Sequence, residues 1–466
     1  MSTEATDREA AVALAEALGN LPLALEQAAA YAGQTGLSLA DYLSLFRERA
    51  AAYVPPASPS ADYPDALAVT FEIAFTRLGE ESPAAADLLT LCAFLAPDEV
   101  PLEIFKEVSA KEEAEEEEAE EEEEAYVQLP EALASVAANP EALTAAAATL
   151  QTYAFAKVRG GSFLSMHRLT QAIARDRLGD DERKRLAESG VTLMRASFSF
   201  DSEDTRTWPP SARLLQHALT VAEHARALGI AGKQNMILLN KVGKYLDTNA
   251  ELAEAKAAFI KSTELCEQLF GSTHPRLGAL LNNIGETLRR QGLLDEATKY
   301  LKRALAIDEV ALGLDHPNVA IGLHNLGNVL SERGAHAEAR EHLERALAIF
   351  ESGGDPTRAY VAITLNNIGL ILSAQDNLKV ARAYYERALQ IYEEVYGHDH
   401  PQVAIALNNL GDNLIRLGDV VAARQYLERG MRIFQAHLGE KHPWTLIAKR
   451  NLEQLDEHDA DSPSFG

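Results

Sequence analysis

Four asparagines recur at a constant spacing in the C-terminal half of the chain, and their side chains could bind another protein. They are Asn283, Asn325, Asn367 and Asn409, each 42 residues from the next. A side-chain amide can donate a hydrogen bond to a peptide backbone and accept one from it. The same amides could instead bond to one another and hold neighbouring segments in register. Both roles can coexist, so the sequence leaves this choice open.

More polar side chains lie within a turn or two of these asparagines along the chain. They are Arg289, Arg290, Asn328 and Arg416. An arginine guanidinium matches the geometry of a carboxylate, so these residues could recognise a carboxylate or a polar side chain of a partner. The four asparagines and these four residues form the predicted partner-binding set.

No motif in the sequence predicts catalysis or a cofactor. A phosphate-binding loop would place backbone N–H groups and a lysine around phosphates, but the nearest dipeptide, Gly243-Lys244, lies inside a predicted helix. The cysteines and histidines do not have metal-site spacing. Four histidines stand before prolines at predicted helix starts, and we interpret them as capping residues: His274, His316, His400 and His442. The prediction is a non-enzymatic protein without cofactor or metal.

Composition and charge narrow the class of partner. The 466 residues carry a net charge of −27, but residues 111–125 hold eleven glutamates and one lysine. Residues 271–438 hold 17 lysines and arginines against 20 acidic residues, so this part is close to neutral. Nucleic acid binding needs a concentrated basic face, which argues against it here. No apolar run approaches the roughly 20 residues of a membrane span. We expect a cytoplasmic protein with no membrane partner, whose Cys92 and Cys266 are buried thiols.

Small residues recur with the same 42-residue period as the asparagines. Glycines stand at 243, 285, 327, 369 and 411, and alanines follow twelve residues later at 297, 339, 381 and 423. A third set, seven residues further on, consists of Ala304, Ala346, Ala388 and Gly430. A fixed period of this length predicts a solenoid. Since a mid-helix glycine costs about 1 kcal/mol relative to alanine, we expect the glycines to allow two helix backbones to approach closely.

The pattern within each repeat predicts two helices. Leu277, Leu281, Ile284 and Leu288 form one apolar stripe, a turn follows at Gly292, and the second helix ends near Gly313. Prolines suit the first turn of the next helix because they lack an N–H group. They stand at 275, 317, 356, 401 and 443.

The small residues at the eighth, twentieth and twenty-seventh places of each unit resemble those of tetratricopeptide repeats. The length of 42 residues and the G-x-x-HP-x-V-A junctions (Gly313 to Ala320, Gly397 to Ala404) resemble the variant found in kinesin light chains and many bacterial regulators. The resemblance implies a right-handed superhelix whose first helices line a concave groove. It also implies that the four asparagines face that groove, which would hold a protein or peptide ligand, with self-association as an alternative.

The N-terminal half resembles another family. Residues Gly19 to Leu25, GNLPLAL, resemble the GxP motif of NB-ARC and STAND-type NTPases. Residues 70–105 resemble the opening helices of the winged-helix domain that follows in bacterial members. Ser165 to Leu169, SMHRL, stands in the place of the MHD-type motif, with arginine where that motif has aspartate. The resemblance implies that Pro22 and His167 sense a nucleotide.

These observations predict a mostly α protein. Its expected parts are a helical segment resembling the ARC helical domain (1–53, with Ser38 as an N-cap), a linker (54–69), a winged-helix-like domain (70–180), bridging helices (181–235), five tetratricopeptide units with a closing helix (236–455) and a disordered tail (456–466). Within the winged-helix-like domain we predict an acidic insert at 107–126 and a small β-hairpin. Its strands, Thr152–Val158 and Ser162–Met166, would flank a Gly160-Gly161 turn.

Three functional hypotheses follow. The leading one is a protein-interaction scaffold that binds a partner in the groove. The second is a nucleotide-responsive switch or a fragment of one, because the chain resembles the C-terminal part of such NTPases without the P-loop. The third is a winged-helix transcriptional regulator, which is disfavoured because Arg168, Arg175 and Arg177 are partly offset by Asp176.

Overall fold

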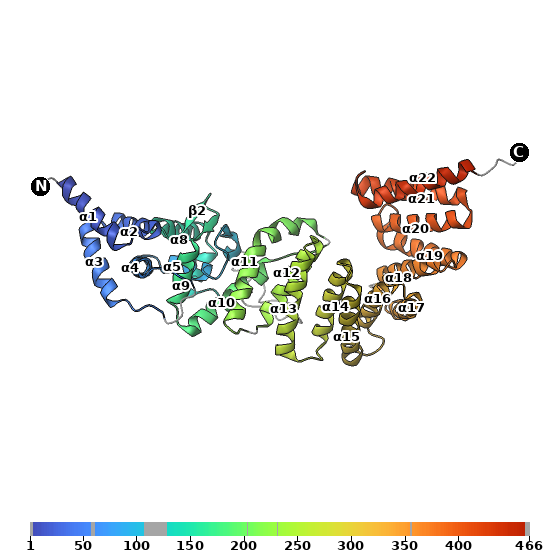
Figure 1. Cartoon of the computed structure of the whole chain (residues 1–466), viewed down its shortest axis with the longest axis horizontal. Helices are drawn as coiled ribbons and strands as arrows, with labels where there is room; N and C mark the ends of the chain where they lie inside the picture. The colour runs from blue at the N-terminus through green and yellow to red at the C-terminus, as the bar shows by residue number, and fades with distance from the viewer. Residues whose placement is uncertain are drawn as a thin grey trace. The chain divides into compact units, whose positions relative to one another are not determined.

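The computed structural model describes residues 3–56, 61–106, 128–202, 204–230, 232–354 and 357–461 (Figure 1). The chain divides into two compact units, Met1–Leu269 and Phe270–Gly466. Both are mostly helical, as predicted. The predicted acidic insert, 107–126, and the Asp355-Pro356 pair lie outside the described residues.

Unit 1 opens with five helices. They are α1 (Thr3–Ala17), α2 (Pro22–Thr35), α3 (Leu39–Ala52), α4 (Asp65–Glu81) and α5 (Pro83–Cys92). Ser38 caps α3 as predicted, because its hydroxyl accepts a 3.2 Å hydrogen bond from the Asp41 N–H. Helix α4 begins at Asp65, so the last five residues of the predicted linker are helical.

A small three-stranded sheet follows in the order β1-β3-β2. Strands β1 (Val100–Pro101), β2 (Lys157–Arg159) and β3 (Phe163–Ser165) pair antiparallel, with Leu164 opposite both Val100 and Val158. Gly160 and Gly161 form the turn with φ values of 58° and 67°, a conformation that glycine adopts without steric cost. The predicted strand from Thr152 was wrong at its start, because the alanine-rich helix α8 continues through that residue.

The remaining elements of unit 1 are again helical. They are α7 (Glu131–Ala137), α8 (Pro140–Thr152), α9 (Arg168–Asp176), α10 (Asp180–Ser197), η1 (Thr205–Thr207), α11 (Trp208–Ala227), α12 (Lys233–Thr248) and α13 (Leu252–Phe270). Helices α12 and α13 are the first repeat pair, so the division between the units falls inside the segment predicted as one array. Cys92 and Cys266 are buried free thiols, as predicted.

Unit 2 continues the helix pairs. They are α14 (Pro275–Arg290) with α15 (Leu294–Leu312), α16 (Pro317–Glu332) with α17 (His336–Ser352), α18 (Arg358–Ala374) with α19 (Leu378–Tyr396), and α20 (Pro401–Leu417) with α21 (Val420–Leu438), followed by α22 (Pro443–Asp461). Helix α22 extends to Asp461, so residues 456–461 are helical rather than disordered.

The periodic glycines make room for a large side chain from the second helix of the same pair. A Cβ atom on Gly285 would lie 2.5 Å from Leu301 Cγ, and one on Gly369 would lie 2.6 Å from a Tyr385 ring carbon. Gly243, Gly327 and Gly411 are crowded in the same way. A side chain of the second helix therefore fills the space that each of these glycines leaves. Close backbone approach does occur at Gly327, whose Cβ would lie 3.2 Å from the Ala339 carbonyl oxygen.

Histidines begin four helices of unit 2, which confirms their predicted capping role. The Nδ1 atom of each histidine accepts a hydrogen bond from the backbone N–H two residues later, at 3.1 to 3.2 Å. The four residues are His274, His316, His400 and His442. Two of these rings also stack on an aromatic ring at the end of the preceding helix: Phe270 on His274 and Tyr396 on His400.

The second helices are linked by a repeated ion pair. Arg345 contacts Glu309 at 2.6 Å, and the same contact recurs one repeat later between Arg387 and Glu351. A third copy joins Arg429 to Glu393 at 2.5 Å. In each case the arginine of one second helix binds the glutamate of the preceding one, so the pair repeats with the period of the sequence.

Asp308 is an exception within the repeats. Phe350, Tyr392 and Phe434 occupy the corresponding place in the following units. The Asp308 side chain is only 4% exposed and lies against Gly278, where a Cβ atom would be 2.0 Å from Oδ1. Burial raises the pKa of Asp308 to about 6. A carboxylate therefore stands at a position where the three following units bury an aromatic ring.

Candidate binding surface on the first helices of unit 2

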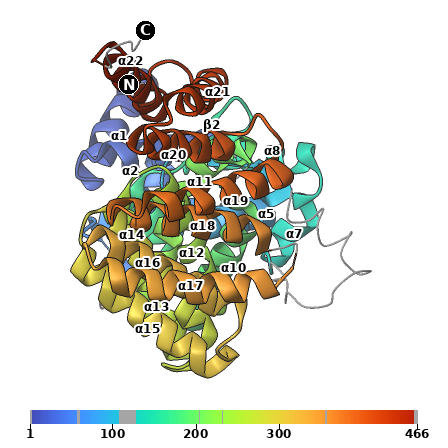
Figure 2. The same cartoon turned by 90° about the vertical axis from the view of Figure 1, so that its right-hand side faces the viewer.

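The first helices of unit 2 present neighbouring rows of partly exposed side chains. Helices α14, α16, α18, α20 and α22 contact one another in succession (Figure 2). We define their exposed and partly exposed residues as the first-helix face. Its four rows are Ala279, Ile321, Ile363, Ile405 and Ile447; Asn283, Asn325, Asn367, Asn409 and Asn451; Glu286, Asn328, Leu370 and Asp412; and Arg290, Glu332, Ala374 and Arg416.

The asparagine row bonds from helix to helix. Asn325 Nδ2 donates to Asn282 Oδ1 at 3.2 Å. Asn409 donates in the same way to Asn366 at 3.0 Å, and Asn451 donates to Asn408 at 3.0 Å. Bonding between asparagines of neighbouring helices was one of the two roles that the sequence left open, and this ladder of hydrogen bonds is present in the structure. It also fixes the direction in which each amide points.

His324 interrupts this ladder. It stands where Asn282, Asn366 and Asn408 stand in other repeats, so Asn367 has no amide partner at that position. Asn367 Nδ2 instead donates to Asn328 Oδ1, one turn further along α16, at 2.8 Å.

A chain of hydrogen bonds fixes the state of the His324 ring. Asn328 Nδ2 lies 3.0 Å from His324 Nε2, and His324 Nδ1 lies 3.0 Å from Thr364 Oγ1. Because an amide nitrogen only donates, Nε2 accepts and the proton is on Nδ1. Thr364 in turn donates to the Tyr360 carbonyl oxygen at 2.7 Å. Desolvation, together with the nearby Arg289, lowers the pKa of His324 to about 4, so the ring is neutral at physiological pH.

Two of the predicted arginines are held by groups of unit 2 itself. Arg289 donates to both Glu286 oxygens, at 2.9 and 2.6 Å, and also contacts Glu332. The hydrogen bonds to Glu286 are the main reason that the pKa of Arg289 is raised. Arg416 donates to the Ser373 hydroxyl at 2.6 Å and to Asp376 at 3.1 Å. Arg290 is exposed at the end of α14.

A cavity of about 300 Å³ opens where the ladder is interrupted. It brings together three predicted residues, Arg289, Asn328 and Asn367. Sequence reasoning missed the other members that shape it, including Ser331, Glu332 and Leu370. The 42-residue period could have identified Leu370 and Glu332, because they occupy the same rows as Asn328 and Arg416. The other predicted residues, Asn283, Asn325, Asn409, Arg290 and Arg416, lie elsewhere on the first-helix face.

The two residues assigned to nucleotide sensing by resemblance both stand at helix starts in unit 1. Pro22 is the first residue of α2. His167 caps α9, since its Nδ1 atom accepts a 3.1 Å hydrogen bond from the Leu169 N–H. Their role with a nucleotide stays a prediction. In the described part of the chain, no three His, Cys, Asp or Glu side chains are placed to hold a metal ion, and no helix is long and apolar enough to cross a membrane.

Comparisons with known families locate repeats in the same region. The tetratricopeptide repeat family matches residues 236–309, 277–352, 360–436 and 404–462. A domain of unknown function (DUF7779) matches residues 76–183. The comparison with curated proteins found no match.

Solved structures that match parts of this chain include BtubC (BKLC) from P. vanneervenii, with 21% identity over 53% of this chain and 95% of that one, at a TM-score of 0.41. A Rap protein complexed with competence and sporulation factor has 14% identity over 60% of this chain and 77% of that one, at a TM-score of 0.41. Pseudomonas aeruginosa pilF has 18% identity over 49% of this chain and 93% of that one, at a TM-score of 0.33.

Proposed function

Because residues 236–462 carry tetratricopeptide repeats, we propose that the protein is a non-enzymatic interaction scaffold whose first-helix face binds an extended segment of a partner protein. The observation that carries this proposal is the oriented row of amides. Asn325, Asn367 and Asn409 each donate one N–H group backwards to the preceding helix. Within the described residues, their Oδ1 atoms accept no hydrogen bond. Each amide therefore offers an acceptor and a second N–H group at the surface.

The spacing of the rows suits an extended peptide. Packed helices lie about 8–10 Å apart, and an extended chain advances about 3.3 Å per residue. Roughly three residues of a bound peptide would span one repeat, so every third peptide group could pair with one asparagine. The neighbouring row of Ile321, Ile363, Ile405 and Ile447 would cover apolar side chains of the same peptide.

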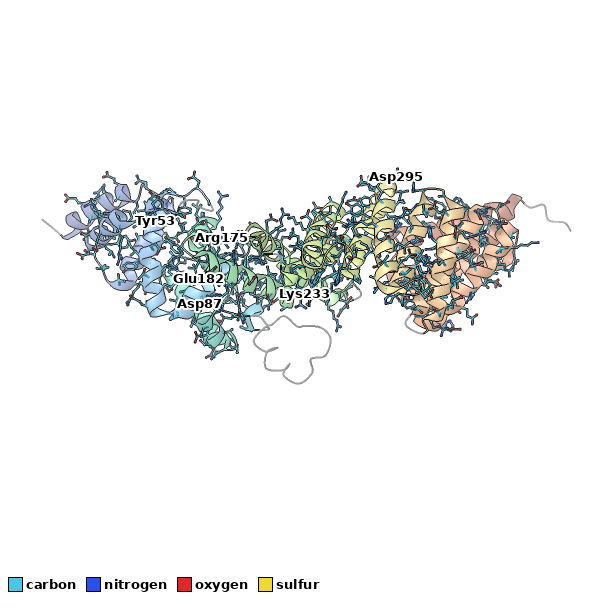
Figure 3. The ribbon with its side chains drawn as sticks, turned by 90° about the horizontal axis from the view of Figure 1, so that it is seen from below. Tyr53, Asp87, Arg175, Glu182, Lys233 and Asp295 are labelled. Atoms are coloured by element: carbon cyan, nitrogen blue, oxygen red, sulfur yellow. The ribbon has the colours of Figure 1, made fainter. Side chains whose placement is uncertain are left out.

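The basic residues near α9 are poorly placed for DNA binding. Arg175, labelled in Figure 3, donates to the Ala93 carbonyl oxygen, and burial lowers its pKa. Arg177 lies over the Phe75 ring at 3.8 Å and donates to Glu72 at 3.1 Å. Since both guanidinium groups are engaged inside unit 1, we propose protein rather than nucleic acid as the partner.

The test is a selection of peptides from a randomised library on the full chain, followed by affinity measurement. Replacing Ile363 on the first-helix face by glutamate should weaken the selected peptides at least tenfold, because a charge would replace an apolar contact. The matched control is Val310→Glu on α15, which is 83% exposed and lies off this face. Equal affinity for both variants, each with a native melting temperature, would contradict the proposal.

A further inference from the structure

The cavity between α14, α16 and α18 has its own charge. We propose that it is the specificity subsite of the first-helix face and binds a cationic side chain, lysine or arginine, of the partner segment. This inference rests on the proposed function. At this subsite the scaffold would select the residue type at one position of the bound peptide.

The charge comes from an acidic triad of two glutamates and one arginine. Arg289 lies between Glu286, which it binds through two hydrogen bonds, and Glu332. Arg289 and Glu332 line the cavity, and Glu286, which does not line it, brings the summed charge of these three residues to −1. Arg333, the next residue after Glu332, does not offset it, because Arg333 contacts Asp295 at 2.7 Å at the start of α15 (Asp295 is labelled in Figure 3). A cation entering the cavity therefore meets a favourable potential.

The remaining walls suit a long aliphatic side chain with a charged end. Leu370 lines the cavity and is 46% exposed, so it offers an apolar surface there. The methylene groups of lysine or arginine can lie along such a surface while the charged end stays polar. Glu332, the Ser331 hydroxyl and the Asn367 Oδ1 atom provide acceptors along the same wall. Within the described residues, neither the Ser331 hydroxyl nor the Asn367 Oδ1 atom has a hydrogen-bond partner.

An anionic side chain fits this place poorly. A carboxylate would have to displace Glu332 from Arg289, because Arg289 is the charged donor that lines the cavity. It would then face the charge of Glu286, which remains bound to the same guanidinium group. Like charges this close are unfavourable when partly removed from water.

The cavity lies where the ladder is interrupted. With His324 in place of asparagine, Asn367 pairs with Asn328 one turn further along α16. Both of these amides line the cavity, so the substitution that changes the ladder also shapes the proposed subsite. The other three junctions between successive first helices of unit 2 keep the regular amide pairing.

The experiment uses the full chain and the randomised peptide library. We expect the selected peptides to share a lysine or arginine at one position, and replacing that residue by norleucine should weaken binding about tenfold. With Glu332→Gln the preference for lysine over norleucine should fall to less than twofold while binding itself persists. The matched control is Glu344→Gln on α17, whose partner is Arg340 on the same helix. This control should keep the preference.

Each outcome decides the question. Peptides whose binding is lost with Ile363→Glu but which have no basic position would overturn the subsite and leave the proposed function standing. A basic preference that survives Glu332→Gln would also overturn the subsite. If no peptide is enriched, or if binding is insensitive to Ile363→Glu, then the proposed function fails and the subsite with it.

Discussion

Asn367 on α18 donates its hydrogen bond to Asn328 on α16. In the next repeat, Asn409 on α20 donates to Asn366 on α18, which lies one turn nearer the start of its helix than Asn328 does in α16. The difference is caused by His324, which replaces the expected asparagine and binds Asn328 and Thr364. One residue type thus changes how two helices are joined, although the 42-residue period of the backbone continues without interruption.

His324 should make unit 2 less stable in acid. Its pKa in the folded state is about 4, below the ordinary value of about 6.5. The unfolded state therefore binds more protons between these values, and stability falls as the pH falls through this window, by up to roughly 3 kcal/mol. His324→Asn should abolish that loss. Urea unfolding should show equal pH dependence in the wild type and His437→Asn, which changes an exposed histidine, and a flatter profile in His324→Asn. An unchanged profile would show that the ring does not titrate as described.

Asp308 should have the opposite pH dependence. Burial raises its pKa from 3.8 to about 6, so the folded state binds the proton more tightly and stability falls as the pH rises through this window. Asp308→Asn should therefore stabilise unit 2 at pH 7.5, by up to roughly 3 kcal/mol, with a smaller gain at pH 5. Thermal unfolding at both pH values measures this. Asp315→Asn, at an exposed position before α16, is the control, and an equal gain there would contradict the explanation.

Two glycines of helix α16 should respond oppositely to alanine. At Gly327 a Cβ atom would lie 2.7 Å from Leu343 Cγ, so Gly327→Ala should cost about 1–3 kcal/mol through overpacking. At Gly322 the nearest atom would be Leu305 Cδ1 at 3.6 Å, an ordinary contact. Gly322→Ala should then stabilise the helix by up to about 1 kcal/mol. Chemical denaturation of both variants gives the two signs, and the same sign for both would remove the packing explanation of the periodic glycines.

The capping histidines should be replaceable by other capping residues. His316→Ala removes the acceptor for the Asn318 N–H and should cost about 0.5–2 kcal/mol. His316→Asn supplies a side-chain oxygen at the same place and should lose less than half of that. Urea unfolding at pH 8 measures both differences. If the two variants were equally destabilised, the histidine ring would contribute through packing rather than through its hydrogen bond.

The sequence predicted the parts of the fold that repeat. The 42-residue phase predicted the helix pairs, the capping role of His274 and its three counterparts, and the burial of the glycines. It did not predict that Leu301 or Tyr385 fills the space beside a glycine, because the period shows which positions are small and not which side chain enters. Helix ends were also missed at Asp65 and Asp461, where helix-forming residues extend beyond the loop signals.

The candidate site was predicted in part. The asparagine row was expected, and its ladder is present. The cavity was not expected, because it is lined by Asn367 and Asn328, and the period does not show whether Asn367 pairs with a residue 39 or 43 positions earlier. That choice follows from the side chain at position 324, which the sequence does show: a histidine in a row of asparagines. Glu286 and Glu332 were not predicted, because the sequence pattern identified only arginines as charged residues of the site.

The ion pairs between successive second helices have a consequence for how the array could have grown. Arg345, Arg387 and Arg429 each find a glutamate 36 residues earlier, so every internal unit offers one half of a pair at each of its two ends. A duplicated stretch of 42 residues, inserted in frame, would join its neighbours through contacts that already exist. The number of repeats can therefore change by whole units while neighbouring units keep the same ion pair between them.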